Sequence, residues 1–211
     1  MNSRASGTRP TVIVIEDDEA VRESLHGLFR SVGLGVKQFA SVEDLADEDL
    51  SDIPGCMVLD VRLPGKSGLA YYDDLVRAGS QRPVIFISGH ADVPMSVRAM
   101  KAGAVEFLTK PVRDQDLLDA VHLAIERDRR QRESARLVQK LKQDLDSLSP
   151  REREVMGYVV AGFQNRQIAE KVGLSEGTVK LHRGNVMHKM QAGSLAELIR
   201  IADSLGMTST K

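Results

Sequence analysis

The chain has 211 residues, of which 42% are hydrophobic and 28% are charged. This length suits two small domains, and the composition excludes a collagen-like, a low-complexity or a wholly disordered chain. No window holds the roughly 18 apolar residues of a membrane helix, and the N-terminal segment lacks the apolar region of a secretory signal. The single cysteine, Cys56, cannot form an internal disulfide. We therefore expect a cytoplasmic protein with no membrane contact.

Charge is unevenly spread along the chain, although the net charge is only −1. Residues 1–125 carry 13 basic and 19 acidic side chains, whereas residues 149–211 carry 9 and 6. An acidic N-terminal part and a basic C-terminal part predict two domains with different partners. The resulting division is a first domain at residues 10–125, a helical linker at residues 126–148 and a second domain at residues 149–206.

The first domain alternates apolar runs with amphipathic stretches. The first run, TVIVI at residues 11–15, is continuous and β-branched, which is typical of a buried parallel strand. The five predicted strands lie at residues 11–15, 34–39, 56–59, 83–87 and 105–108. Helical patterns lie between them, and Ser41 with Asp44 indicates the start of a further short helix. The alternation predicts a doubly wound α/β fold around a five-stranded parallel sheet.

The stretch from residue 114 to residue 147 contains neither glycine nor proline. An uninterrupted helix of roughly 34 residues would be about 50 Å long. Its first part carries apolar residues that should pack on the sheet, but residues 126–136 are almost wholly charged. This favours a solvated connector that continues the last helix of the first domain. Leucines at helical spacing beyond residue 136 leave a coiled coil as the alternative.

The second domain contains short helical patterns only, at residues 150–161, 165–172, 178–190 and 195–205. Two of these helices are joined by the tight turn Gly173-Leu174-Ser175. Short helices joined by a glycine-containing turn are typical of a helix-turn-helix. We therefore predict a small all-α domain joined by a long helix to the α/β domain.

Polar residues stand where four of the predicted strands end. Glu16 and Asp17 follow the first strand, Asp60 the third, Ser88 the fourth and Lys110 the fifth. Because ligands of open α/β sheets bind outside the carboxyl ends of the strands, we expect these side chains in one pocket. Clustered carboxylates need a cation, and an oxygen-rich pocket suits Mg²⁺ or Mn²⁺. A carboxylate beside such a metal can attack phosphorus and form an acyl phosphate, with a lysine neutralising the transferring group.

Four segments carry a resemblance to a known family, namely VIVIEDDEAVR, VLDVRLPGKSG, ISGHADVPMSVRAMKAGA and FLTKP. Over about residues 10–125 the chain resembles the receiver domain of two-component response regulators. The resemblance implies that Asp60 is the phospho-acceptor, assisted by Mg²⁺. It implies that Asp17 binds the metal directly, Glu16 mainly through water, and Arg62 through its backbone carbonyl.

The same resemblance assigns the groups that respond to phosphorylation. It implies that Ser88 is the switch hydroxyl, Lys110 the phosphate-binding lysine and Phe107 the switch aromatic residue, with a cis bond before Pro111. This chain departs from the family pattern at Glu16, where aspartate is commoner. Phe107 also lacks the hydroxyl group of a tyrosine switch, so burial would have to fix its inward state.

The segment LSPREREVMGYVVAGFQNRQIAEKVGLSEGTVKLHRGNVMHKM resembles the helix-turn-helix of the LuxR/NarL superfamily, over about residues 149–206. Together with the receiver, it makes the chain most similar to the FixJ branch. The resemblance places Lys180, Leu181 and Gly184 toward DNA bases. Candidates for phosphate contacts are Thr178, Arg183 and Lys189 on the same helix, and Asn165, Arg166 and Gln167 on the preceding one. A protein-binding helical bundle is the alternative for this segment.

These features together imply a transcription regulator that is switched by phosphorylation. A sensor histidine kinase would donate a phosphoryl group to Asp60, and the receiver would catalyse only its own phosphorylation and dephosphorylation. It would then form a homodimer through the faces at residues 93–102 and 105–108 and bind double-stranded DNA. Two other classes remain open: an aspartyl-phosphate-forming hydrolase, and a receiver that acts by protein–protein interaction only.

Overall fold

The computed structural model describes residues 9–46, 48–89 and 93–207 of the chain. The chain divides after Arg132 into two compact units, each with its own core. In the part that the structure describes, no helix has both the length and the apolar character needed to cross a membrane.

The first unit is built on a five-stranded parallel sheet. Its strands are β1 (Thr11–Ile15), β2 (Gly35–Phe39), β3 (Gly55–Asp60), β4 (Val84–Ser88) and β5 (Glu106–Thr109). They lie in the order β2-β1-β3-β4-β5, and every neighbouring pair is parallel. The predicted doubly wound fold is confirmed, and β1 and β3, which carry the acidic residues, lie side by side.

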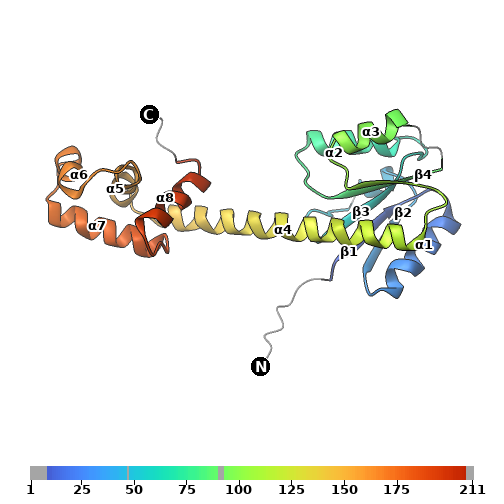
Figure 1. Ribbon diagram of the computed structural model, residues 1–211, viewed down its shortest axis with the longest axis horizontal. Coiled ribbons are helices and arrows are strands. Elements are labelled where there is room, and N and C mark those ends of the chain that lie inside the picture. Colours follow the sequence, from blue (N-terminus) through green and yellow to red (C-terminus); the bar gives the residue numbers. More distant parts are fainter. Residues whose placement is uncertain (1–8, 47, 90–92, 208–211) are drawn as a thin grey trace, which may run out of the picture. The chain divides into compact units, whose positions relative to one another are not determined.

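Helices cover both faces of this sheet. The helices are α1 (Glu19–Ser31), α2 (Gly68–Arg77), α3 (Val93–Lys101) and α4 (Asp114–Asp146). In the first unit α1 and α4 pack on one face, and α2 and α3 pack on the other (Figure 1). The short helix expected after Ser41 is only the 3₁₀ turn η1 (Glu43–Leu45). Ser41 and Asp44 do cap each other, but the acidic residues that follow offer no apolar face to extend the turn.

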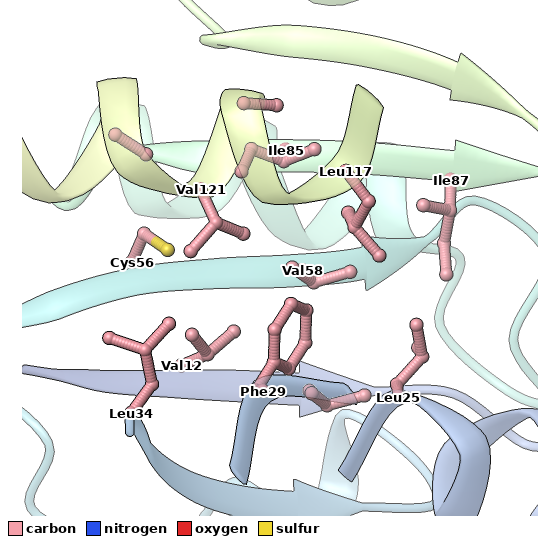
Figure 2. Packing of buried hydrophobic residues seen from close by; sticks show 13 residues of the cluster. Val12, Leu25, Phe29, Leu34, Cys56, Val58, Ile85, Ile87, Leu117 and Val121 are labelled. Carbon is pink, nitrogen blue, oxygen red and sulfur yellow. The ribbon is translucent and has the colours of Figure 1, made fainter. Parts of the chain in front are cut away.

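Successive residues of the central strands alternate between two cores, which explains their continuous apolar runs. On one face Val12 and Val58 of the sheet meet Phe29 of α1 and Val121 of α4, all fully buried (Figure 2). The other face buries the intervening strand residues against α2 and α3. Each such side chain contributes about 1.5–3 kcal/mol on burial. The packing therefore fixes the strand ends, on which the functional side chains stand.

The charged beginning of the predicted linker belongs to the first unit. Asp128 of α4 is only 5% exposed, and its carboxylate accepts hydrogen bonds from Gly55 N at 2.8 Å and Arg132 Nε at 2.8 Å. Gly55 has φ +134°, and a Cβ there would lie 2.0 Å from Thr11 O. Only glycine therefore allows β3 to begin this close to the Thr11 backbone. Arg132 also donates to Ile53 O at 2.8 Å. The expectation of a solvated connector is thus wrong for Asp128, because its carboxylate is buried and bound by Gly55, which is 73 positions away.

Asp128→Asn is expected to lower the free energy of unfolding of the first unit by about 2–3 kcal/mol, because it removes the charge that balances Arg132. Amide hydrogen exchange of β3 in the full chain measures this loss. The matched control is Glu126→Gln, since Glu126 pairs with Arg129 and both side chains are about half exposed. The control substitution should lower the free energy of unfolding by less than about 1 kcal/mol. Equal losses in the two variants would show that Asp128 does not anchor α4.

The second unit is all-α. It contains α5 (Pro150–Val160), α6 (Asn165–Val172), α7 (Glu176–Lys189) and α8 (Leu195–Ser204), together with the later residues of α4. Fully buried Val155, Ile168, Val179 and Leu198 bring one residue from each helix into its core. Helix α7 begins two residues before the expected start, because Ser175 Oγ accepts from Thr178 N at 3.1 Å and caps it there.

Candidate functional site

Three carboxylates meet at the carboxyl ends of β1 and β3. Glu16 and Asp17 follow β1, and Asp60 is the last residue of β3. One oxygen of each lies within 4.8 Å of the others. Glu16 is 1% and Asp60 5% exposed, whereas Asp17 is exposed. Carboxylates held this close repel one another, and a set of oxygen donors with one open side fits a hard divalent cation such as Mg²⁺.

Lys110 neutralises part of this charge. Its Nζ lies 2.6 Å from Glu16 Oε2 and 2.6 Å from Asp60 Oδ2. Burial raises the pKa of Glu16, and the charge of Asp60 adds to this, although the hydrogen bond from Lys110 opposes it. Burial alone would lower the pKa of Lys110, but its hydrogen bonds to Asp60 and Glu16 outweigh that effect and raise it. The lysine therefore stays charged between the two buried acids.

Asp60 is held on both of its oxygens. Arg62 N donates to Oδ1 at 3.0 Å, and Lys110 Nζ binds Oδ2. The start of α2 passes directly over the Asp60 backbone, because a Cβ on Gly68 would lie 2.1 Å from Asp60 O. Glycine at this position therefore permits the close approach. The result is a carboxylate of fixed orientation that faces the other two acids.

The two expected switch residues stand on β4 and β5. Ser88 ends β4, is fully buried and pairs in register with Thr109. Phe107 of β5 is partly buried, and its ring centroid lies 6.0 Å from that of Phe86. The peptide bond between Lys110 and Pro111 is cis, as the resemblance implies. The sheet thus places Ser88 and Lys110 at the same edge as Asp60.

Arg22 is a contributor that the sequence pattern did not predict. Its Nη1 donates to Glu16 O at 2.7 Å and Asp17 O at 3.2 Å, and Gln38 Nε2 donates to Arg22 O at 2.9 Å. These contacts tie the loop that carries two of the acids to α1. An arginine on the polar face of an amphipathic helix looks solvated in sequence. The sequence feature that could have revealed this role is the position of Arg22 one turn into the helix, within reach of the backbone carbonyls of Glu16 and Asp17.

The second unit carries the predicted helix-turn-helix in α6 and α7. The turn between them begins at Gly173, which has φ +68°. Lys180, Leu181 and Gly184 lie on the exposed side of α7, and Leu181 is 64% exposed. A Cβ at Gly184 would meet nothing within 4 Å, so the backbone is open there. An exposed face of this kind can approach a groove.

The candidates for phosphate contacts differ in their surroundings. Arg183 Nη1 donates to Asn165 Oδ1 at 3.2 Å, which joins α7 to the start of α6. Arg166 is exposed and pairs with Glu170, while Gln167 accepts from Gln164 N and caps α6. Thr178 Oγ1 lies 2.8 Å from Ser175 Oγ.

Lys189 differs from these candidates because it contacts a buried acid. Its Nζ lies 2.7 Å from Glu152 Oε2, and Glu152 is 4% exposed. Glu152 also accepts from Ser149 N at 2.8 Å, which completes a capping box at the start of α5. The spacing S-x-x-E at residues 149–152 could have revealed this cap. Lys189 therefore fastens the end of α7 to α5.

The Glu152 contacts predict a pH dependence. The hydrogen bond from Lys189, followed by that from Ser149 N, lowers the pKa of Glu152 from 4.5 to about 2. A depressed carboxyl pKa stabilises the fold above the unfolded pKa, and this stability is lost as the pH falls toward 2. We expect the second unit to lose about 2–3 kcal/mol between pH 5 and 2 from this group. Amide hydrogen exchange of α5 and α7 measures it.

Glu152→Gln is the control for this pH dependence, since it removes the titrating group and leaves an acceptor oxygen for Ser149 N. The variant should be less stable at pH 6 and should lack this part of the loss at lower pH. An unchanged pH profile in the variant would contradict the assignment.

Comparison with known proteins defines the class. The response regulator receiver domain family matches residues 12–122, and the luxR family of bacterial regulatory proteins matches residues 146–202. The chain therefore belongs to the response regulators, as a receiver domain joined to a LuxR-type domain. This confirms the predicted transcriptional response regulator of a two-component system.

Individual relatives cover nearly the whole chain. It is 53% identical to nodulation protein W of Bradyrhizobium diazoefficiens, over 97% of this chain and 90% of that protein. The structure of response regulator StyR is 40% identical, with a TM-score of 0.84, and the match covers 92% of this chain and 98% of that one. Full-length FixJ from B. japonicum is also 40% identical, with a TM-score of 0.57, over 96% and 100% of the two chains. These matches agree with the FixJ-type architecture.

Proposed function

We propose that Asp60 accepts a phosphoryl group from a sensor histidine kinase, and that this event promotes DNA binding by the LuxR-type domain. The observation that carries the proposal is the convergence of Glu16, Asp17 and Lys110 on Asp60. A carboxylate flanked by acids for a metal and by a lysine can act as the nucleophile in phosphoryl transfer, because the cations neutralise the transferring group.

Asp17, Asp60 and the backbone carbonyl of Arg62 would hold Mg²⁺, with Glu16 acting mainly through water. When bound, the metal supplies positive charge beside the transferring phosphoryl group. An Asp60 oxygen attacks phosphorus, the bond from phosphorus to the kinase histidine nitrogen breaks, and the imidazole leaves with the electron pair. Lys110 neutralises charge on the phosphoryl oxygens. The reaction ends in a phosphoaspartate, so the receiver is a switch and not a turnover enzyme.

The new charge then reorganises one face of the receiver. We infer that Lys110 moves from Glu16 and Asp60 to the phosphoryl group, that Ser88 donates to a phosphoryl oxygen, and that Phe107 moves inward. The adjacent helix α3 exposes three apolar side chains: Val93 (75% exposed), Val97 (43%) and Met100 (42%). This apolar surface supports a homodimer formed through α3 and β5.

The homodimer would present two copies of α7 to double-stranded DNA in the cytoplasm. Lys180, Leu181 and Gly184 would face bases. Thr178 and Arg183, with Asn165, Arg166 and Gln167 at the start of α6, would contact phosphates. Lys189 is already engaged with Glu152, so we assign it mainly to holding α7 in place.

DNA binding of the full chain tests the proposal. Beryllofluoride with Mg²⁺ mimics the phosphoryl group, and a bound sequence is first selected from random duplexes. Affinity should rise with beryllofluoride, and it should fall steeply with salt, because each phosphate contact releases counterions. Lys180→Ala should relax the sequence preference. Salt-independent binding to another protein, without binding to DNA, would favour a receiver that acts by protein–protein interaction only. Sustained turnover of a phosphomonoester would favour the hydrolase.

A further inference from the structure

The three acids of the site are not held in the same way. The carboxylates of Glu16 and Asp60 are nearly buried, and both bind Lys110. Asp17 differs, because its side chain is exposed and no described residue donates a hydrogen bond to its carboxylate. The direction of the Asp17 carboxylate therefore depends on how the backbone of its loop is held.

The loop between β1 and α1 is fastened at its two ends and in its middle. At one end Glu16 N donates to Phe39 O at 3.1 Å, and at the other Asp18 caps α1. In the middle, Arg22 Nη1 donates to Glu16 O at 2.7 Å and to Asp17 O at 3.2 Å. These two carbonyls belong to the peptide units on either side of the Asp17 Cα. Because peptide units are planar, holding both of them fixes the direction in which the Asp17 side chain leaves the backbone.

Arg22 is itself anchored to the sheet that carries the acids. Its backbone carbonyl accepts from Gln38 Nε2 at 2.9 Å, and Gln38 of β2 pairs in register with Val14 of β1. The Arg22 side chain is partly buried. The arginine, the loop and β1 therefore form one connected arrangement.

The charge of Arg22 and its hydrogen bonds have opposite effects on a bound cation. A positive charge near the three acids repels a cation and weakens its binding. Hydrogen bonds that orient the Asp17 backbone hold one carboxylate toward the other two and strengthen its binding. The sign of the change on removing Arg22 therefore shows which effect dominates.

We propose that Arg22 is a positioning residue for the divalent cation, and that it acts through the carbonyls of Glu16 and Asp17 and not by contact with the metal. The inference rests on the proposed function, because it concerns the metal site of that reaction. Groups that orient metal ligands typically change metal affinity by roughly 10- to 100-fold. The orienting effect should thus exceed the repulsion by the arginine charge.

Titration of the full chain with Mn²⁺, followed by the electron paramagnetic resonance signal of the free ion, tests this role. Arg22→Met should weaken Mn²⁺ binding by about 10-fold, although it removes a repelling charge. Arg22→Lys should regain part of the affinity, because its ammonium group can still donate to one of the carbonyls. The proposal is overturned if Arg22→Met binds Mn²⁺ as tightly as the unaltered chain or more tightly. It is also overturned if Arg22→Lys binds no better than Arg22→Met.

Two control variants locate the measured effect. Arg30→Met makes the same substitution at an exposed position in the last turn of α1, and it should leave Mn²⁺ affinity unchanged. An equal loss in Arg30→Met and Arg22→Met would show a general effect of helix charge and contradict the proposal. Asp17→Ala should abolish the saturable site. Binding that persists in Asp17→Ala would place the ion elsewhere and would equally contradict the proposal.

The Mg²⁺ dependence of adduct formation with a small phosphodonor separates positioning of the metal from a part in the transfer itself. Arg22→Met should raise the half-saturating Mg²⁺ concentration and leave the rate at saturating Mg²⁺ unchanged. A lower rate at saturating Mg²⁺, with the same half-saturating concentration, would contradict the role. If the unaltered chain formed no adduct, the proposed function would fail, whereas the Mn²⁺ titration would still decide the role of Arg22.

Discussion

Asp60→Asn is expected to abolish the phosphoryl adduct of this chain. An amide cannot replace the carboxylate as nucleophile, and Asp60 is the carboxylate that Arg62 N and Lys110 hold at the end of β3. The fold should persist, because an asparagine oxygen still accepts from Arg62 N. Intact mass after incubation with Mg²⁺ and a small phosphodonor measures the adduct, and light scattering measures the dimer.

Asp18→Asn provides the matched control for this experiment. Asp18 belongs to the same acidic run, but its Oδ1 caps α1 by accepting from Ala20 N and Val21 N. Asparagine caps helices as well as aspartate does, so this variant should keep both the fold and the adduct. An adduct that persists on Asp60→Asn, or dimerisation of that variant on addition of phosphodonor, would contradict the assignment of Asp60.

The features that sequence predicted best are those encoded locally. Each strand of the sheet was predicted from a short stretch of neighbouring residues, and its observed bounds differ from the predicted ones by at most one residue at either end. The meeting of Glu16, Asp17, Asp60 and Lys110 followed from one rule, that the carboxyl ends of parallel strands share an edge. Both inferences can be made from residues that are neighbours in the sequence and from the parallel direction of the strands.

The features that sequence missed are charged side chains buried by distant partners. Asp128 meets Gly55, which is 73 positions away, and Lys189 meets Glu152, which is 37 positions away. Charged residues on helices are usually solvated, so hydrophobic periodicity assigns them to the surface. Only the tertiary arrangement shows that these charges are paired inside the two units. Such pairs also explain why a charged stretch of α4 can belong to a packed domain.

Lys110→Met is expected to lower the free energy of unfolding of the first unit by about 3 kcal/mol without divalent metal. Glu16 and Asp60 would then face each other while nearly buried, and the loss of one partner from a buried ion pair is strongly destabilising. Mg²⁺ should restore more stability to this variant than to the unaltered chain, because the cation replaces the missing charge. Amide hydrogen exchange of β1 and β3, with and without Mg²⁺, measures both effects.

Lys66→Met is the matched control, because it shows how much stability is lost when a lysine outside the acidic site is replaced by methionine. Lys66 pairs with Asp74, but both side chains are more than a third exposed, so its loss should cost less than about 1 kcal/mol. Mg²⁺ should stabilise that control as much as the unaltered chain. If Mg²⁺ stabilised Lys110→Met no more than the control, the lysine and the metal would not share the same carboxylates. A larger gain in Lys110→Met would mean that Lys110 holds the acids together until a cation binds, which leaves the lysine free to reach a phosphoryl group on Asp60.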